Sequence, residues 1–364
     1  MALVLTLSVL FLGVVHLSTA EDQLLAVNML YRHGDRTPSK FYPNDPYQDP
    51  ALWPNPMGQL TNMGKRQHYE LGQWIRNRYN GFLSQTYEKD EIYIRSSDVD
   101  RCLMSAASNV AGLYPPVGKD LWQNDIIWQP IPIHSIPKMN DDIAEFKTSC
   151  SIFRKQVKKV ISEYFKEYDE KNEIIYDYLT EVTGKKIKNF KSASSIYDTL
   201  HVEKIYNFTL PEWSIPLFSK LKEYNALAKK VLTYTPKLNR LANGRLFDNI
   251  INQFTYFANE TDCTVDKPEK FRVFSAHDTQ VSSILNGLRV PHESDIPYAA
   301  TIIFELRRTE QGQIYVNTLF KSQPQVADLI EIRGCDKNCD FDKFLYVMKP
   351  LSLTEKEFKE ECEN

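Results

Sequence analysis

Apolar segments along the chain predict buried strands that alternate with amphipathic helices. The segments 24–31, 91–97 and 271–277 have the length and composition of buried strands. Between the first two, residues 60–83 have apolar residues near helical spacing, at Leu60, Leu71, Trp74, Ile75 and Tyr79. This order of strands and helices predicts a layered α/β fold, with helices on both faces of a central sheet.

Later segments predict a hairpin and a helical insertion. Residues 300–308 and 314–322 flank a polar turn and are typical of an antiparallel hairpin, which we expect at a sheet edge. Residues 140–240 are rich in lysine and glutamate, with apolar positions at intervals of three and four. We therefore expect an α/β catalytic domain built from 21–139 and 241–364, with 140–240 as a smaller, mainly helical cap.

The first twenty residues predict a secretory signal peptide. They are almost entirely apolar and end in Ser18, Thr19 and Ala20, small residues of the kind that a signal peptidase reads. No later apolar run reaches the ~18 residues of a membrane span. We expect a mature chain without a membrane anchor, secreted or in the lysosomal lumen.

Cysteines, sequons and charge agree with that compartment. The chain has six cysteines, an even number that predicts disulfides but leaves about fifteen pairings open. The sequons at Asn207 and Asn259 predict N-glycosylation. A net charge of −3 lacks the basic footprint of a nucleic-acid binder, so we expect no nucleic-acid partner.

A cluster of charge follows the first predicted strand. Arg32, His33 and Arg36 lie where the apolar run ends, and unpaired buried cations would be costly there. The cost disappears at the carboxyl end of the strand, where open α/β sheets bind ligands. Because guanidinium groups match phosphate geometry, this cluster predicts a phosphate cradle around an imidazole. A solvated loop is the alternative for this motif alone.

Two more predicted strands end in similar chemistry. Arg95 ends the second strand, and His277 and Asp278 follow the third. Three strands that end in such residues favour one shared site over three unrelated loops. A metal site made of His33, Asp35, His277 and Asp278 is disfavoured, because the nearby arginines would repel a divalent ion and the spacing fits no common ligand motif. We expect neither a metal nor another cofactor.

These residues lie in motifs that resemble a known family. "RHGDRTP", "YIRSSDVDRCLMSA" and "SAHDT" are similar to those of the histidine acid phosphatases, the acid branch of the histidine phosphatase superfamily, including secreted, lysosomal and insect venom or salivary members. The resemblance implies a phosphoglycerate mutase-like fold. It also implies His33 as nucleophile, Asp278 as proton donor, and Arg32, Arg36, Arg95 and His277 as phosphate ligands.

The resemblance also bears on disulfides and assembly. It implies the pairs Cys150–Cys362 and Cys335–Cys339, and leaves Cys102 and Cys263 to pair with each other. Trp128 and His134 match positions that the family uses at a dimer contact. A homodimer is therefore one interpretation of these two residues, and simple packing is the other.

The function implied is hydrolysis of small phosphate monoesters or phosphotyrosine through a phosphohistidine. Activity should lie on the acid side if burial raises the pKa of Asp278 enough to keep it protonated near pH ~5, whereas the neighbouring arginines would lower that pKa. The alternative is a secreted salivary or venom protein that binds small ligands on the same scaffold. The intact set of site residues favours the enzyme. The physiological substrate stays open, because the cap resembles the family only loosely.

Overall fold

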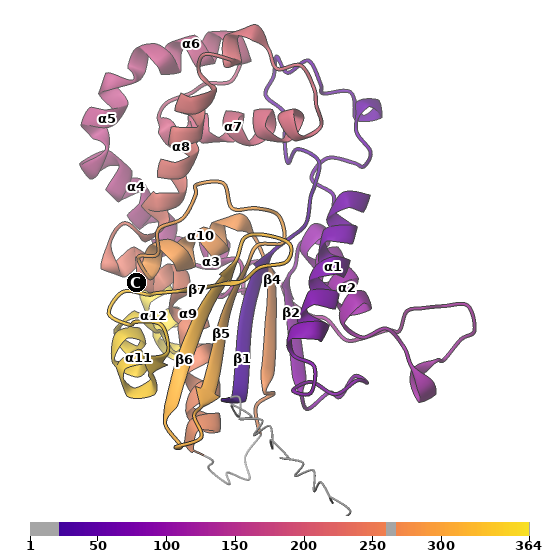
Figure 1. Ribbon diagram of the computed structural model, residues 1–364. Helices are drawn as coiled ribbons and strands as arrows, with labels where there is room; N and C mark the ends of the chain where they lie inside the picture. Colours follow the sequence, from indigo (N-terminus) through magenta and orange to yellow (C-terminus); the bar gives the residue numbers. More distant parts are fainter. Residues whose placement is uncertain (1–21, 260–266, 364) are drawn as a thin grey trace, which may run out of the picture.

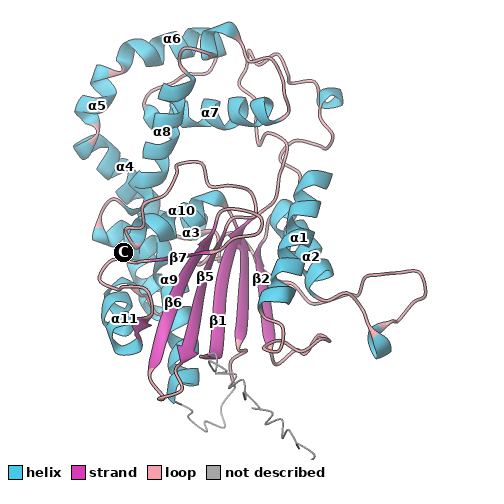
Figure 2. Ribbon diagram, in the orientation of Figure 1, coloured by secondary structure: helices cyan, strands magenta, loops and turns pink. Residues whose placement is uncertain are grey.

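The computed structural model describes residues 22–259 and 267–363. Within them, a mixed sheet of eight strands forms the centre of the molecule (Figure 2). The strands are β1 (Gln23–Arg32), β2 (Ile92–Ser97), β3 (His134–Ile136), β4 (Phe271–Ala276), β5 (Thr301–Arg308), β6 (Ile314–Lys321), β7 (Asp328–Ile330) and β8 (Cys339–Asp340). Their order is β3-β2-β4-β1-β5-β6-β7, with β8 also beside β6. The first four strands are joined in parallel, and the others by antiparallel pairing.

Helices cover both faces of this sheet (Figure 1). They are α1 (Asn62–Arg78) and α2 (Asp100–Leu113) on one face, and α9 (Pro236–Asn259), α10 (Asp278–Gly287) and α11 (Phe341–Met348) on the other. Side chains of β1 alternate between the two apolar cores: Ala26 and Leu30 pack with α9, α10 and α11, whereas Val27 and Met29 pack with α1 and α2. The predicted layered α/β fold is confirmed.

The predicted hairpin is present, but it is not at the edge of the sheet. Thr301 pairs with Lys321 and Arg308 with Ile314, in an antiparallel register without interruption. On one side β5 adjoins β1, and on the other side β7 and β8 pair with β6. The added strands have only three and two residues, too few to produce a recognisable apolar pattern.

The region between β3 and α9 is helical and lies over the carboxyl ends of the parallel strands (Figure 1). It contains α3 (Phe146–Ser149), α4 (Ser151–Tyr164), α5 (Lys166–Lys171), α6 (Glu173–Thr183), α7 (Phe190–Ile205) and α8 (Phe218–Lys230). These helices share a third apolar core. The proposed boundary at 240 falls inside α9, whose Leu241 packs with the cap and whose Leu246 packs against the sheet. One continuous helix therefore serves both cores.

Two disulfides are confirmed and a third is wrong. Cys150 at the start of α4 pairs with Cys362 in α12 (Glu355–Glu363), and Cys335 pairs with Cys339. Cys102 is instead a buried free thiol that faces the Ala276 carbonyl at 3.4 Å, so it does not pair with Cys263. Cys263 and the predicted signal peptide lie outside the described residues.

Short 3-10 helices complete the secondary structure, at Pro50–Leu52, Gly118–Asp120, Glu212–Ser214, Val231–Thr233 and Lys349–Leu351. In the part of the chain that the structure describes, none of the helices is both long and apolar enough to span a membrane.

A buried pair of carboxyl groups joins α7 to the loop after β1. Glu203 is fully buried, and burial, followed by the nearby Asp45, raises its pKa to about 8. A carboxyl pKa that is higher in the folded chain contributes stability below about pH 4.5, which is lost as pH rises towards 8. The fold is therefore suited to acid conditions at this position.

Replacement of Glu203 by glutamine should stabilise the protein near neutral pH. At pH ~7.5 we expect a gain on the order of 2 kcal/mol, seen as a melting temperature about 4 °C higher. At pH ~3.5 the two proteins should melt together, because the wild-type side chain is then mostly protonated in both the folded and the unfolded state. Exposed Glu173→Gln is the control, and an equal gain in it, or the same Glu203→Gln gain at both pH values, would contradict the prediction.

Candidate active site

The two histidine motifs lie at the ends of neighbouring parallel strands. In the β1–β4 register Arg32 pairs with Ala276, and the His33 amide donates to the Ala276 carbonyl at 2.9 Å. The rings of His33 and His277 are 5.5 Å apart between centroids and inclined at 74°. The carboxyl ends of the strands thus bring together two motifs that are far apart in sequence, as predicted.

His33 is held as a neutral imidazole with one free nitrogen. Its Nδ1 is 2.8 Å from the Gly34 carbonyl oxygen, which can only accept, so Nδ1 carries the proton and donates it. The Nε2 lone pair is then available for attack. Burial, followed by the charges of Arg32 and Arg101, lowers the pKa of His33 well below its usual value. The ring therefore stays neutral, and nucleophilic, in acid.

The loop after His33 is locked against helix α1. A Cβ added at Gly34 would lie 2.4 Å from the Gly64 carbonyl oxygen, so no larger residue fits without movement of the backbone. Asp35 accepts from the Thr61 hydroxyl at 2.5 Å and from the Tyr206 hydroxyl at 2.6 Å. These contacts fix the backbone that carries His33.

Arg32 and Arg36 lie beside His33 and are almost fully buried. The Arg32 guanidinium lies 4.0 Å from the centroid of the Tyr298 ring and donates to the Ile296 carbonyl. Arg36 forms an ion pair with Asp198 of α7, in which its Nη2 donates to both carboxylate oxygens, at 2.8 and 3.0 Å. Both guanidiniums are therefore oriented in advance by fixed partners, and both charges act on the imidazole.

The Arg95 side chain does not join Arg32 and Arg36 beside His33. Its Nη2 is 2.5 Å from Asp141 Oδ1 and 3.3 Å from Asp142 Oδ1, so these carboxylates neutralise its charge. Side chains alternate along β2: Ile94 packs with α1 and α2, which turns Arg95 to the opposite face. The expected phosphate ligand is thus part of an ion-paired network that anchors the segment after β3.

Arg101 occupies the place expected for Arg95. It lies in the first turn of α2, and its Nη2 is 3.3 Å from His277 Nδ1. Its charge also contributes to the lowered pKa of His33. The same sequence motif contains both arginines. The start of helix α2 distinguishes them. A helix that follows a strand begins at the strand's carboxyl end, so an arginine in its first turn lies at the site.

Glu145 orients His277, and sequence reasoning missed it. Its Oε1 is 2.9 Å from His277 Nε2 and accepts from the Ser97 hydroxyl at 2.8 Å. Burial raises the pKa of Glu145, but these hydrogen bonds and the His277 charge outweigh it and lower the pKa to about 2. A fixed carboxylate therefore sets the position of the ring. Glu145 lies 132 residues from His277 in sequence and belongs to no motif that would single it out.

Asp278 is ion-paired to a lysine of the cap. Its Oδ2 is 2.9 Å from Nζ of the buried Lys229 in α8. Burial raises the pKa of Asp278, but the Lys229 and Arg32 charges lower it by more, and the net pKa lies well below its usual value. Of the two opposing effects expected for this carboxyl, the nearby cations outweigh burial, and the largest of them, Lys229, was not indicated by the sequence.

The described residues contain no group of three or more histidine, cysteine, aspartate or glutamate side chains that could hold a metal ion. What they do contain at this place is a neutral imidazole, three guanidiniums, a second imidazole and an ionised carboxylate. This set is suited to bind a phosphate and to accept a phosphoryl group on nitrogen.

Comparison with known proteins assigns the family. The family model "Histidine phosphatase superfamily (branch 2)" matches residues 23–321. The chain belongs to this family. The fold and the motifs at the ends of β1 and β4 are those of a branch 2 histidine phosphatase, as the resemblance implied.

Relatives of this histidine phosphatase are similar over almost the whole chain. Lysosomal acid phosphatase of Xenopus laevis is 35% identical over 372 residues, covering 100% of this chain and 84% of its own. The lysosomal enzyme of Homo sapiens is 35% identical, covering 95% and 81%. Prostatic acid phosphatase of Homo sapiens is 33% identical, covering 92% and 87%.

A solved structure supports the same fold for this histidine phosphatase. The phytase from Citrobacter braakii superposes with a TM-score of 0.66, at 17% identity, covering 93% of this chain and 99% of that one. At this identity the likeness concerns the fold, and the chemistry of the site must be argued from its residues.

Proposed function

We propose that this protein is an acid phosphatase that hydrolyses phosphate monoesters through a phosphohistidine at His33. The observation that carries the proposal is the neutral His33 ring, with Nδ1–H bound to a carbonyl and Nε2 free, among the guanidiniums of Arg32, Arg36 and Arg101. The family and the acid phosphatase relatives support the same activity.

In the first step, His33 Nε2 attacks phosphorus and the bond from phosphorus to the leaving oxygen breaks. Charge that develops on the phosphoryl oxygens is stabilised by the three guanidiniums and His277, which are already oriented by their partners. The Gly34 carbonyl keeps its hydrogen bond to Nδ1–H and stabilises the positive charge that the ring acquires. The result is a phosphohistidine and a leaving alkoxide that needs a proton.

The substrate can supply that proton, so Asp278 need not be protonated before the substrate binds. Below the second phosphate pKa of about 6, a monoester binds as a monoanion that carries one proton. The proton passes through the Asp278 carboxylate to the leaving oxygen. In the second step Asp278 takes a proton from water as the water oxygen attacks phosphorus and the bond to Nε2 breaks. This route requires acid conditions because the substrate, rather than the resting enzyme, supplies the proton.

The test is to trap the intermediate. Enzyme mixed with radiolabelled p-nitrophenyl phosphate and denatured within the first turnover should carry label in a linkage that is stable in alkali and lost in acid. Turnover should persist with a metal chelator between about pH 4 and pH 6 and decline above. A linkage stable in acid, or no turnover at any pH, would refute the proposal and favour a ligand-binding role for the scaffold.

Lys229 should set the alkaline limit of activity. Its ammonium lowers the pKa of Asp278, so Lys229→Met should raise that pKa and let Asp278 hold its own proton at higher pH. The descending limb of kcat/KM against pH should therefore move to higher pH for p-nitrophenyl phosphate. Lys220→Met, on the same helix but paired with Glu223, should leave the limb in place. If the descending limb of Lys229→Met lay at the same pH as that of the wild type, proton transfer through Asp278 would be contradicted.

Secretion or lysosomal delivery and glycosylation are part of the proposal. The support is the apolar N-terminus and the lysosomal and prostatic relatives. Asn207 and Asn259 are both exposed, so either side chain has room for an N-linked glycan. A mass shift on treatment with an N-glycosidase, mapped to these two positions, would test this part.

We also propose a homodimer that uses Trp128 and His134. Both side chains are exposed, and His134 lies on β3, the terminal strand beside β2. Light scattering should give twice the chain mass for the wild type and one chain mass for the double variant Trp128→Asp, His134→Asp. A monomeric wild type would favour simple packing for these residues.

A further inference from the structure

A cavity of about 510 Å³ adjoins the catalytic residues on the cap side. Arg36 and Asp278 are part of its wall, so it is continuous with the proposed phosphate site. The wall also contains cationic side chains from the loop after β1 and from four helices: Lys40, Lys147, Arg154, Lys191 and Lys229. A leaving group that extends from the phosphorus through this cavity would meet these cations.

The positive charge of this wall is largely uncompensated. Its two carboxylates are already used, because Asp198 is paired with Arg36 and Asp278 with Lys229. Among the described residues, no carboxylate lies within ion-pair distance of Lys40 or Lys191, and both lysines line the cavity. The wall therefore carries a net positive charge that a bound anion would balance.

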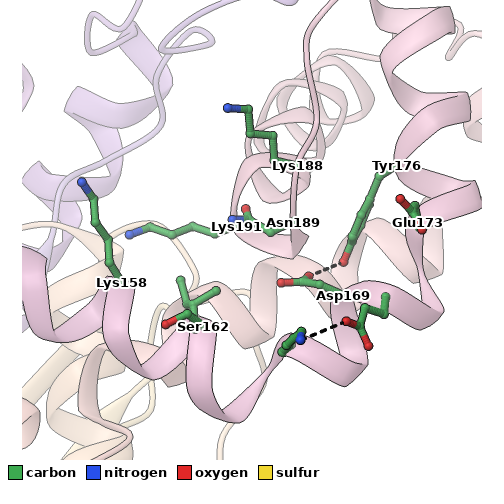
Figure 3. A pocket seen from close by; sticks show the side chains of 11 residues that line it. Lys158, Ser162, Asp169, Glu173, Tyr176, Lys188, Asn189 and Lys191 are labelled. Atoms are coloured by element: carbon green, nitrogen blue, oxygen red, sulfur yellow. Dashed lines mark hydrogen bonds and ion pairs between the residues drawn. The ribbon is translucent and has the colours of Figure 1, made fainter.

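Lys191 also lines a second cavity, of about 620 Å³, within the cap. Figure 3 shows Lys158 of α4, Lys188 and Lys191 with their side chains directed to the same side of this cavity. Three carboxylates also line this cavity, those of Asp169, Glu170 and Glu173. Asp169 accepts from the Tyr176 hydroxyl at 2.8 Å and from a backbone amide, and Glu170 is paired with Lys166 at 3.6 Å. The lysines thus form a row that continues outward from the catalytic site.

Electrostatics agree with a missing counter-charge. Burial, followed by the charges of Lys147 and Lys158, lowers the pKa of Lys191. Burial also lowers the pKa of Lys147 by more than the charges of Asp278 and Glu145 raise it, and Lys147 donates to the Thr279 hydroxyl at 2.9 Å. An anion placed between Lys147 and Lys191 would relieve this repulsion, since opposite charges favour the charged form of each lysine.

We infer that the cavity beside Arg36 and Asp278 is a second anion subsite, which selects phosphate monoesters whose leaving group carries another phosphate. This inference rests on the proposed function, because it assigns a substrate class to the same active site. Lys40, Lys147 and Lys191 hold the second phosphate while His33 attacks the first. The row toward Lys158 and Lys188 admits longer polyphosphorylated leaving groups.

The test compares two substrates that differ by one phosphate. For the wild type, kcat/KM should be about tenfold or more higher for fructose 1,6-bisphosphate than for fructose 6-phosphate, since two or three exposed charge contacts together supply that factor. The double variant Lys40→Gln, Lys191→Gln should lower this ratio about tenfold. Lys159→Gln is the matched control: it removes an exposed cation from α4 that is paired with Glu163 and lines neither cavity.

A binding measurement separates this inference from the proposed function. Calorimetry with the His33→Ala protein, which should not turn over either sugar, should show tighter binding of the bisphosphate, and the lysine double variant should remove the difference. Loss of turnover in the wild type with this binding difference intact would refute the phosphatase proposal alone. Equal binding of the two sugars, or an equal effect of Lys159→Gln, would overturn the subsite.

Discussion

Replacement of His33 by alanine should lower kcat/KM for p-nitrophenyl phosphate by at least about 10⁴-fold. The variant loses the atom that accepts the phosphoryl group, so the two-step route is closed and only direct attack by water remains. Phosphate binding should survive, because Arg32, Arg36 and Arg101 are held by partners other than the His33 ring. Steady-state kinetics together with inorganic phosphate inhibition would measure both effects.

Added imidazole gives the sharper form of this test. A small imidazole that enters the vacated space can act as nucleophile, so it should restore part of the activity of His33→Ala and have no such effect on the wild type. His292→Ala is the control, since that ring contacts Ser282 and the Val290 carbonyl, away from the site. Activity of His33→Ala within tenfold of the wild type, in a protein with unchanged melting temperature, would refute the nucleophile assignment.

Replacement of Arg101 by alanine should lower kcat/KM by about 10²–10³-fold, which is the usual effect of removing one charged donor from a developing anion. It should also weaken inhibition by inorganic phosphate. Free guanidinium in the assay should recover part of the loss. Arg101→Lys should recover less than its retained charge suggests, because an ammonium cannot make the two-pronged contact of a guanidinium.

Arg95→Ala is the comparison that decides between the two arginines. Because Arg95 is ion-paired to the buried Asp141, its loss should destabilise the fold by about 3–5 kcal/mol, seen as a lower melting temperature. At temperatures where the variant remains folded, kcat/KM should stay within about tenfold of the wild type. If Arg95→Ala lost as much activity as Arg101→Ala while folded, the phosphate contact would belong to Arg95.

Local patterns predicted the parts of the fold that depend on neighbouring residues in sequence. The apolar run before Arg32 and the run before His277 each required a buried strand, and both strands are present. Because parallel strands end at the same edge of a sheet, the sequence alone predicts that the two histidines lie together. The short strands β7 and β8 could not be predicted, since pairing with β6, and not their own pattern, creates them.

Partners distant in sequence limited the prediction of the site. Glu145 and Lys229 lie outside the motifs, yet they orient His277 and determine the charge of Asp278. Cys102 was expected in a disulfide because an even cysteine count favours pairing. Its side chain is instead packed beneath the site, within 3.8 Å of His277.

The sequence by itself determined the α/β class, the strands that carry the motifs, and the placement of His33, Arg32 and Arg36 at one site, because apolar period and residue chemistry act locally. Only the tertiary structure decided between Arg95 and Arg101, since the direction of a side chain depends on which face of β2 is packed against α1 and α2. It also decided the charge state of Asp278. The physical reason is the same in both cases: electrostatic energy depends on distance in space, and Lys229 reaches Asp278 only when the helical cap folds over the sheet.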